Sequence, residues 1–221
     1  MSSFGGIVVP VEITVPETAD VLGVSARRVR QLIDAGRLRA RRVGRQWLVD
    51  GASLPMAPRR SRPMSVSVAW AFLVGVEPAD PQAARRWRQR RRQLADDPEP
   101  ESLLASWVAS RGERLELAGR ELGAVVADPR LVLSGMSDSR AGLSAADLAE
   151  GWVSASDLDG FCRDHLLLPA TAAPSVVVHV APVTVAVPAP VPLLLLAADL
   201  ADHHQPRPTA RARDLIGQAL A

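Results

Sequence analysis

The sequence predicts an α+β protein with two parts, a small domain of two helices and a hairpin followed by a larger mixed α/β domain. Two short helical patterns and an Arg-rich alternating segment fill residues 14–50. From residue 101 onward, short Val- and Leu-rich runs that favour strands are interspersed with helical patterns. The sign of the charge also changes along the chain, which separates the two parts further.

The first helix is predicted to begin at Thr14. Thr14 and Glu17 have the spacing of a capping box, in which each side chain covers a backbone N–H of the other. After a turn at residues 23–25, Ser25 is a good N-cap for a second helix, because its oxygen can accept an N–H of the first turn. Gly36 is typical of the position where a helix ends. The apolar side of the second helix would consist of Val29, Leu32 and Ile33.

Residues 38–43 and 46–49 are predicted to be two strands around Gly44-Arg45, and Trp47 is expected to pack this hairpin onto the helices. The layout is that of a small winged helix-turn-helix domain, whose second helix enters the major groove of double-stranded DNA. Arg suits bidentate contact with guanine or phosphate. The predicted DNA-binding residues are Ser25, Arg27, Arg28, Arg30 and Gln31 on the helix, and Arg39, Arg41, Arg42 and Arg45 on the wing. A protein-binding helical hairpin with a basic face is the alternative, but it explains neither the wing nor the polarity of the second helix.

Three segments in this order, VPETADVLGVS, ARRVRQLIDAGRL and ARRVGRQWLV, resemble the small winged helix-turn-helix domains of excisionases and MerR-type regulators. The resemblance lies within residues 15–49. It implies DNA binding and a role in transcription regulation.

Charge divides the chain into a basic and an acidic half. Residues 1–95 carry a net charge of +10 and residues 96–221 a net charge of −8, which together give the +2 of the whole chain. A basic half suits nucleic acid, whereas an acidic half is repelled by it and suits a protein partner. All 26 basic residues are Arg, which indicates a GC-rich coding bias, so the positions of the arginines carry more weight than their number.

Composition excludes several classes of protein. The single cysteine, Cys162, excludes an intramolecular disulfide, and no CxxC pair indicates a zinc site. The N-terminus lacks the pattern of a signal peptide, so we expect a cytoplasmic protein. The uncharged run over 180–198 contains four prolines, which are incompatible with a membrane-spanning helix. Two buried strands followed by a helix from Leu193 explain that run better.

Three regions are predicted: the DNA-binding domain at 1–54, an Arg- and Pro-rich linker with a helical connector at 55–100, and an acidic α+β protein-interaction domain at 101–221. In the connector, residues 68–76 are predicted to be helical, and Asp80-Pro81 opens another helix. Two interpretations of its many arginines compete. A solvated helix around an apolar stripe is favoured, because coding bias enriches exposed Arg, and an accessory contact to DNA or RNA is the alternative.

The acidic domain is predicted to contain both helices and strands. Residues 103–108 form a helical face, and Ser154 or Ser156 caps a helix that runs to His165. Further helices are predicted at 120–128, 193–201 and 209–220, with strands at 130–134, 176–180 and 183–187, the last two paired.

In the acidic half, DPRLVLSG at 128–135, GWVSASDLDGFCRDHLLLPA at 151–170, SVVVHVAPV at 175–183 and the tail at 193–216 resemble the antitoxins of AbiE-type toxin–antitoxin systems of actinobacteria. In that family an N-terminal winged helix represses the operon, and a C-terminal domain accompanies a nucleotidyltransferase toxin. The resemblance implies a toxin as the protein partner.

No active site is predicted, and neither a metal nor a cofactor is expected. Cys162 and His165 could share a helix face, but an isolated Cys on an apolar helix is usually part of the core. Asp199, Asp202, His203 and His204 could bind a metal in principle, but at a helix end they are better explained as a polar cap and a turn.

The sequence therefore predicts a non-enzymatic transcriptional repressor, the antitoxin of a toxin–antitoxin pair that regulates its own operon. A homodimer is compatible with it. A phage-type excisionase or regulator without a toxin is one alternative, and a ligand-sensing transcription factor is another.

Overall fold

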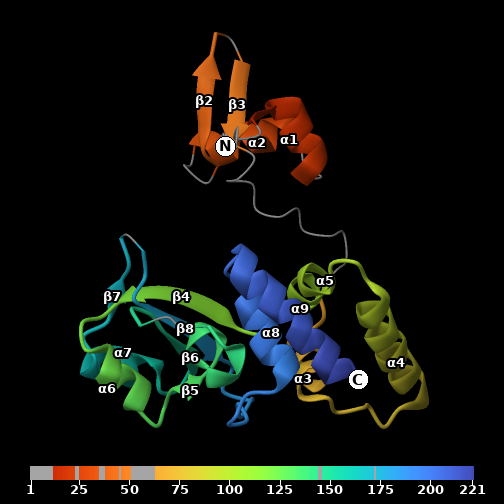
Figure 1. Ribbon diagram of the computed structural model, residues 1–221, viewed down its shortest axis with the longest axis vertical. Coiled ribbons are helices and arrows are strands. Elements are labelled where there is room, and N and C mark those ends of the chain that lie inside the picture. The colour runs from red at the N-terminus through yellow and green to blue at the C-terminus, as the bar shows by residue number, and fades with distance from the viewer. Residues whose placement is uncertain are drawn as a thin grey trace, which may run out of the picture. The chain divides into compact units, whose positions relative to one another are not determined.

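The computed structural model describes residues 12–22, 25–34, 38–44, 46–50, 63–143, 146–171 and 173–221 (Figure 1). The chain divides into two compact units, Met1–Arg60 and Ser61–Ala221. Helices and strands occur in both, as expected of an α+β protein. Among the described residues, no helix is long and apolar enough to cross a membrane.

The first unit contains β1 (Glu12–Thr14), α1 (Val15–Leu22), α2 (Ala26–Asp34), β2 (Ala40–Val43) and β3 (Gln46–Asp50). The strands form an antiparallel sheet in the order β1-β3-β2. The two helices and the hairpin were predicted, but β1 was not. Its three residues are too few for a recognisable alternating pattern, and their pairing partner, β3, lies more than 30 residues further along the chain.

The core of the first unit joins both helices to the sheet. Five buried side chains make it, namely Val15, Ala19, Val29, Leu38 and Val49. Leu32, Ile33 and Trp47 pack against them and are partly buried. The predicted apolar side of α2 and the predicted packing of Trp47 are therefore confirmed.

The second unit combines a helical layer with a five-stranded sheet (Figure 1). The helical layer consists of α3 (Val66–Val74), α4 (Pro81–Asp96), α5 (Pro100–Trp107), α8 (Leu193–Ala201) and α9 (Pro206–Leu220). The strands are β4 (Glu113–Ala118), β5 (Val132–Leu133), β6 (Ala149–Ser154), β7 (Leu168–Pro169) and β8 (Val176–Ala181). Their order is β5-β6-β8-β4-β7, and β6 and β8 are parallel while the other pairs are antiparallel.

Both faces of the central strands are buried. On β8, Val176 and Val178 point into a core with α6 (Leu122–Ala127) and α7 (Leu158–Asp164). His179 and Ala181 belong to the opposite face, which the helical layer covers. Side chains alternate between the two faces of a strand, so Val176 and Val178 face α6 and α7 while His179 and Ala181 face the helical layer. The short 3-10 helices Gly135–Ser137 and Ser139–Ala141 connect β5 to the segment before β6.

The expectation that residues 55–100 form a linker and a helical connector between two domains needs correction. From residue 63 onward these residues belong to the second unit. Trp70 and Phe72 of α3 and Leu94 of α4 lie in the same core as α8 and α9. The reason is that α3 is apolar on most sides, and such a helix is stable only when other elements surround it.

Two further expectations for the acidic half need correction. Residues 183–187 are not a strand, because Pro182 accepts a hydrogen bond from the Val185 N–H in a turn (2.8 Å) and Val183 is 72% exposed. Neither Ser154 nor Ser156 caps α7, since its N-cap is Asp157 and the two hydroxyls bond each other at 2.9 Å. Strands β4 and β6 were not predicted. The helices at 193–201 and near 209–220 are confirmed.

Candidate nucleic-acid interface

A capping box fixes the start of α1. The Thr14 N–H donates to Glu17 Oε2 at 2.8 Å, and the Glu17 N–H donates to Thr14 Oγ1 at 3.4 Å. The Thr14 hydroxyl also donates to Glu17 Oε2 at 2.8 Å, and the bond from the Thr14 N–H together with this one lowers the pKa of Glu17 below its usual value. Thr18 Oγ1 donates back to the Thr14 carbonyl at 2.8 Å and is buried. The predicted capping box is therefore confirmed, and it sets the direction in which α1 leaves the sheet.

Ser25 caps α2 as predicted. Its Oγ accepts the Arg28 N–H at 3.3 Å, and its carbonyl accepts the Val29 N–H at 3.1 Å. The hydroxyl is exposed, and it can still donate its own proton to a second group. Ser25 can therefore cap the helix and contact a phosphate at the same time.

The two sides of α2 have opposite character. Val29 is fully buried, and Leu32 and Ile33 are partly buried against the same core. The four predicted contact residues on the other side are all exposed: Arg27, Arg28, Arg30 and Gln31. Arg28 Nη1 donates to Gln31 Oε1 at 3.4 Å, which places a guanidinium and an amide side by side. This is the pair of group types that reads guanine and adenine edges in the major groove.

The hairpin lies close to α2 because Leu38, 3% exposed, is buried between them and its N–H donates to the Leu32 carbonyl at 3.3 Å. Val43 pairs with Gln46, so two residues make the turn, and the first of them, Gly44, has a φ of +60°. Such a φ favours glycine in two-residue hairpin turns.

Strand register divides the wing arginines between two faces. Arg42 lies opposite Trp47 on the face that also carries the pair Ala40 and Val49, whereas Arg41 lies opposite Leu48 on the other face. Arg39, Arg41 and Arg42 are exposed. Arg45 lies outside the described residues. A ribbon with a guanidinium on each face can contact the phosphates on both sides of a groove.

The second unit contains a buried polar cluster that the sequence did not reveal. Asp199, in the last turn of apolar α8, has no exposed surface and accepts hydrogen bonds from Arg111, Ser134 and Trp152. It lies near a helix end as expected, but its role there is that of a buried acceptor and not of a polar cap. The sequence contained one sign of this cluster. Asp199 is the single charged residue in the apolar helix LLLLAADLA, and a carboxylate buried in such a helix requires hydrogen-bond partners.

A second carboxylate continues this cluster. Glu150 accepts hydrogen bonds from His179 Nε2 at 2.9 Å, from His203 Nε2 at 2.8 Å and from the Met136 N–H at 2.7 Å. Burial alone would raise the pKa of Glu150, but the bonds from the two histidines outweigh it and lower the pKa to about 2. His203 also lines a hollow of about 670 Å³ at the surface. Within the described residues, no group of His, Cys, Asp and Glu has the arrangement of a metal site.

Cys162 packs against the core beside the sheet, and His165 is paired with a carboxylate. His165 Nε2 lies 2.8 Å from Asp128 Oδ2 and its ring packs edge-on against Phe161. Burial, together with the nearby Asp159, raises the pKa of the Cys162 thiol, which disfavours the reactive thiolate.

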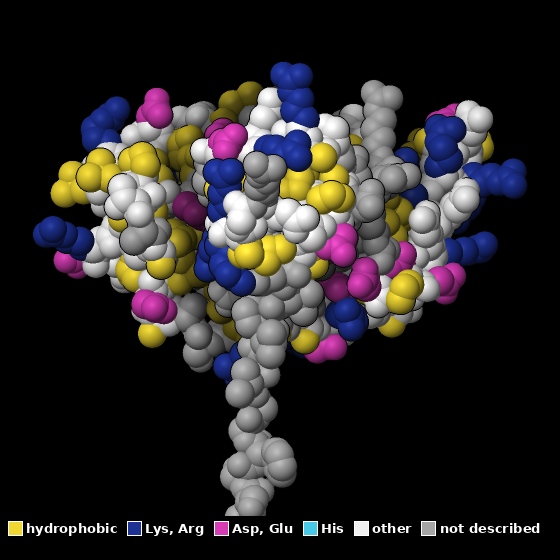
Figure 2. All heavy atoms as spheres, turned by 90° about the horizontal axis from the view of Figure 1, so that it is seen from above, with side chains coloured by type: hydrophobic (Ala, Val, Ile, Leu, Met, Phe, Trp, Pro, Cys, Tyr) yellow, Lys and Arg dark blue, Asp and Glu magenta, His cyan; other side chains and the backbone are white. Residues whose placement is uncertain are grey.

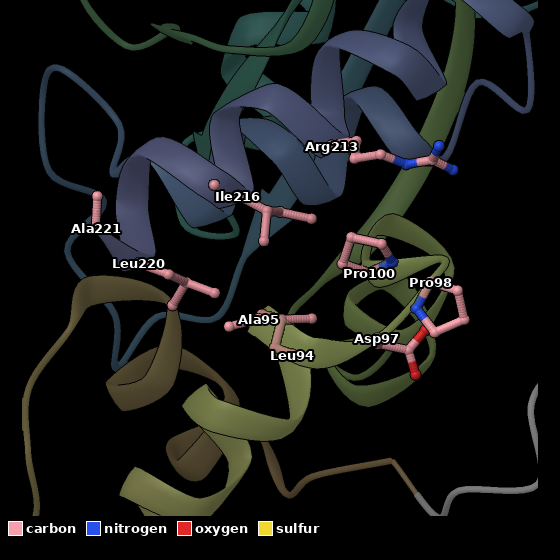
Figure 3. A pocket seen from close by; sticks show the side chains of 10 residues that line it. Leu94, Ala95, Asp97, Pro98, Pro100, Arg213, Ile216, Leu220 and Ala221 are labelled. Carbon is pink, nitrogen blue, oxygen red and sulfur yellow. The ribbon is translucent and has the colours of Figure 1, made fainter.

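A hollow of about 400 Å³ lies between the end of α4, the start of α5 and the last turns of α9 (Figure 3). Leu94, Ile216 and Leu220 contribute to its walls. The guanidinium of Arg213, at its edge, donates to both carboxylate oxygens of Glu101, at 2.9 and 3.1 Å. The hollow therefore offers mainly apolar surface.

Comparison with known proteins bears on the first unit alone. Residues 12–54 match a family described as a helix-turn-helix domain. No curated protein and no solved structure matches the chain. The matched range covers the capped helix α2 with its exposed arginines and the hairpin that follows it. The N-terminal unit is thus a helix-turn-helix domain, the kind of domain by which regulators bind DNA.

Proposed function

We propose that this protein is a sequence-specific DNA-binding repressor that places α2 in the major groove. The observation that carries this proposal is the polarity of α2. Its buried side is fixed in the core by Val29, and its exposed side presents Arg27, Arg28 and Gln31. The N-terminal residues of such a helix reach base edges, because the helix fits the width of the groove.

The wing supplies the second part of the interface. Arg39, Arg41 and Arg42 are exposed, and their guanidinium groups suit the phosphate backbone. These contacts add affinity for any duplex, whereas the contacts of α2 distinguish one sequence from another. Binding is therefore expected to weaken steeply with salt and to depend on sequence through α2.

Selection from a random pool of duplex DNA with the full chain tests this function. Enrichment of one sequence, protected from nuclease by the wild-type chain and not by Arg28→Ala, supports it. Arg163→Ala, which removes an exposed arginine of the second unit, is the control and should protect the same sequence. A pool that stays random after repeated rounds would overturn the proposal.

For the second unit we propose a role in binding a protein, and not in catalysis. We propose that the partner is a nucleotidyltransferase-type toxin and that the protein is its antitoxin, which represses the operon of both. The resemblance of residues 128–135, 151–170, 175–183 and 193–216 to AbiE-type antitoxins supports this, as does the net charge of −8 on residues 96–221. An acidic surface suits a partner that itself binds nucleic acid.

Co-purification of the tagged full chain from its native host, after nuclease treatment, tests the partner. The expected result is a stoichiometric second protein that arrests growth when it is expressed without this chain. Recovery of the chain alone, as a monomer or a homodimer, would overturn the antitoxin role and leave the DNA-binding role standing.

A further inference from the structure

Helix α4 is a long amphipathic element at one edge of the second unit (Figure 1). It spans Pro81–Asp96, and Asp80 caps it by accepting the Ala83 N–H at 2.7 Å. At 1.5 Å per residue its 16 residues extend about 24 Å. Ala84 and Leu94 are buried and Trp87 is half-buried, so one side of the helix is fixed in the core.

One arginine of α4 belongs to that packed side. The guanidinium of Arg91 lies 4.9 Å from the centre of the Trp87 ring, and its Nη2 donates to the Ala219 carbonyl at 2.8 Å. Arg91 therefore attaches α4 to the end of α9, and its role is structural.

The opposite side of α4 consists mainly of Arg and Gln, between Pro81 at its start and Ala95 and Asp96 at its end. Arg85, Arg88 and Arg92 are exposed and follow one another at the i, i+3, i+7 spacing of a single helix face. Three exposed glutamines run beside this row, Gln82, Gln89 and Gln93, and Arg86 is exposed beyond them. Basic side chains project along this edge of the second unit in Figure 2. We call this side of the helix the α4 basic face.

Few carboxylates neutralise the α4 basic face. Arg88 bonds Glu77 at 3.1 Å, with both side chains well exposed. Arg85, Arg86 and Arg92 have no carboxylate within 4.0 Å in the part of the chain that the structure describes. Elsewhere in the second unit, most arginines are paired: Arg111 with Asp199, Arg114 with Glu116, Arg130 with Asp128, Arg140 with Asp138 and Arg213 with Glu101. Coding bias enriches Arg throughout the chain, but it does not explain why these guanidinium groups are left without carboxylates.

A hollow of about 270 Å³ adjoins this face, lined by Trp87, Arg88, Arg91, Arg92, Ala95 and Leu220. The Trp87 Nε1–H is buried and has no hydrogen-bond acceptor among the described residues. The guanidinium groups of Arg88 and Arg92 line the hollow, and they are donors that a phosphate oxygen satisfies.

We propose that the α4 basic face binds the phosphate backbone of double-stranded DNA. It adds contacts that do not depend on sequence to those made by α2. This inference rests on the proposed DNA-binding function and assigns a second DNA-binding surface outside the helix-turn-helix domain. Arg and Gln suit it because both donate to phosphate oxygens, and the nearly carboxylate-free surface avoids repulsion.

The test uses the full chain and a labelled random-sequence duplex of about 30 base pairs, with binding followed by fluorescence anisotropy from about 50 to about 300 mM salt. The variant is Arg85→Gln/Arg86→Gln/Arg92→Gln. Its matched control is Arg120→Gln/Arg163→Gln/Arg207→Gln, which removes three other exposed arginines of the second unit that also lack carboxylate partners among the described residues.

Loss of three phosphate contacts should reduce the slope of log affinity against log salt by about 2 to 3 and weaken binding at least about tenfold at low salt. The control should stay within about twofold of wild type. Equal slopes for the α4 variant and the control would overturn the proposal, because the effect would then be one of net charge. Failure of the wild-type chain to bind any duplex would instead overturn the DNA-binding function itself. Identical far-ultraviolet circular dichroism of all three proteins excludes unfolding as the cause.

Discussion

Arg111 donates two hydrogen bonds to one carboxylate oxygen of Asp199, from Nε at 3.1 Å and from Nη2 at 3.0 Å. Burial alone would lower the pKa of Arg111, but Asp202 and Asp199 outweigh it and raise the pKa, so the guanidinium stays charged. The other oxygen of Asp199 accepts from Ser134 and Trp152. One carboxylate therefore joins α8 to the sheet and to the segment before β4.

Replacing this carboxylate should destabilise the second unit severely. Asp199→Ala leaves the Arg111 charge buried with Asp202 as its remaining carboxylate partner, and breaking a buried pair in this way costs about 3–5 kcal/mol. Urea unfolding followed by tryptophan fluorescence measures the loss. Asp214→Ala removes an exposed carboxylate 3.8 Å from Arg211 and should change stability by less than about 0.5 kcal/mol. Equal stabilities of the two variants would contradict this account.

The stability of the second unit should fall in acid through Glu150. Its pKa is about 2 in the folded protein against 4.5 as the ordinary value, so the unfolded chain takes up the proton first. The contribution of Glu150 is complete above pH 4.5 and is lost as the pH falls toward 2. Integrated over this shift, the contribution is on the order of 3 kcal/mol.

A pH series of unfolding free energies for wild type and Glu150→Gln checks this dependence. The difference between the two proteins should shrink steadily below pH 4.5. A constant difference across that range would mean that the ionised form of Glu150 stabilises nothing.

Two glycines should respond to alanine in opposite directions. A Cβ at Gly135 would lie 2.0 Å from the Glu150 carboxylate, and its φ of +54° disfavours other residues, so Gly135→Ala should cost at least about 2 kcal/mol. Gly217 lies exposed within α9 with no atom within 4 Å of such a Cβ. Gly217→Ala should therefore stabilise the protein by about 0.5–1 kcal/mol. Thermal unfolding of both variants tests the pair, and a stable Gly135→Ala protein would contradict the close packing around Glu150.

Arg28→Ala should weaken binding to the selected sequence by about 1–3 kcal/mol if Arg28 reads a base. Its Nη1 already lies beside Gln31 Oε1, which orients it on the exposed side of α2. Anisotropy titrations with the selected and a scrambled duplex measure the loss. An equal loss on both duplexes would show that Arg28 contacts only phosphate.

The local signals in the sequence predicted most of the first unit. Thr14, Glu17 and Ser25 form hydrogen bonds with residues only three positions away, so the local spacing alone identified the starts of α1 and α2. The partners of the buried polar cluster lie far apart in the sequence, as Glu150 and His203 do, and no local pattern reveals such contacts. The α4 helix was predicted from Asp80-Pro81, but which of its arginines lack carboxylate partners required the structure. Strand β6 was missed because both of its faces are buried, which removes the alternation that identifies a half-exposed strand.

The pairing of Arg111 with Asp199 also limits how early the second unit can fold during synthesis of the chain. All described contacts of the first unit's core lie between residues 13 and 49, so that unit can fold as soon as this short segment has left the ribosome. Helix α3, by contrast, packs against α8, and Arg111 reaches its carboxylates only after α8 has been made. The helix-turn-helix unit can therefore fold first, whereas the apolar surface of α3 is covered only after residues about 120 positions further along the chain have been made.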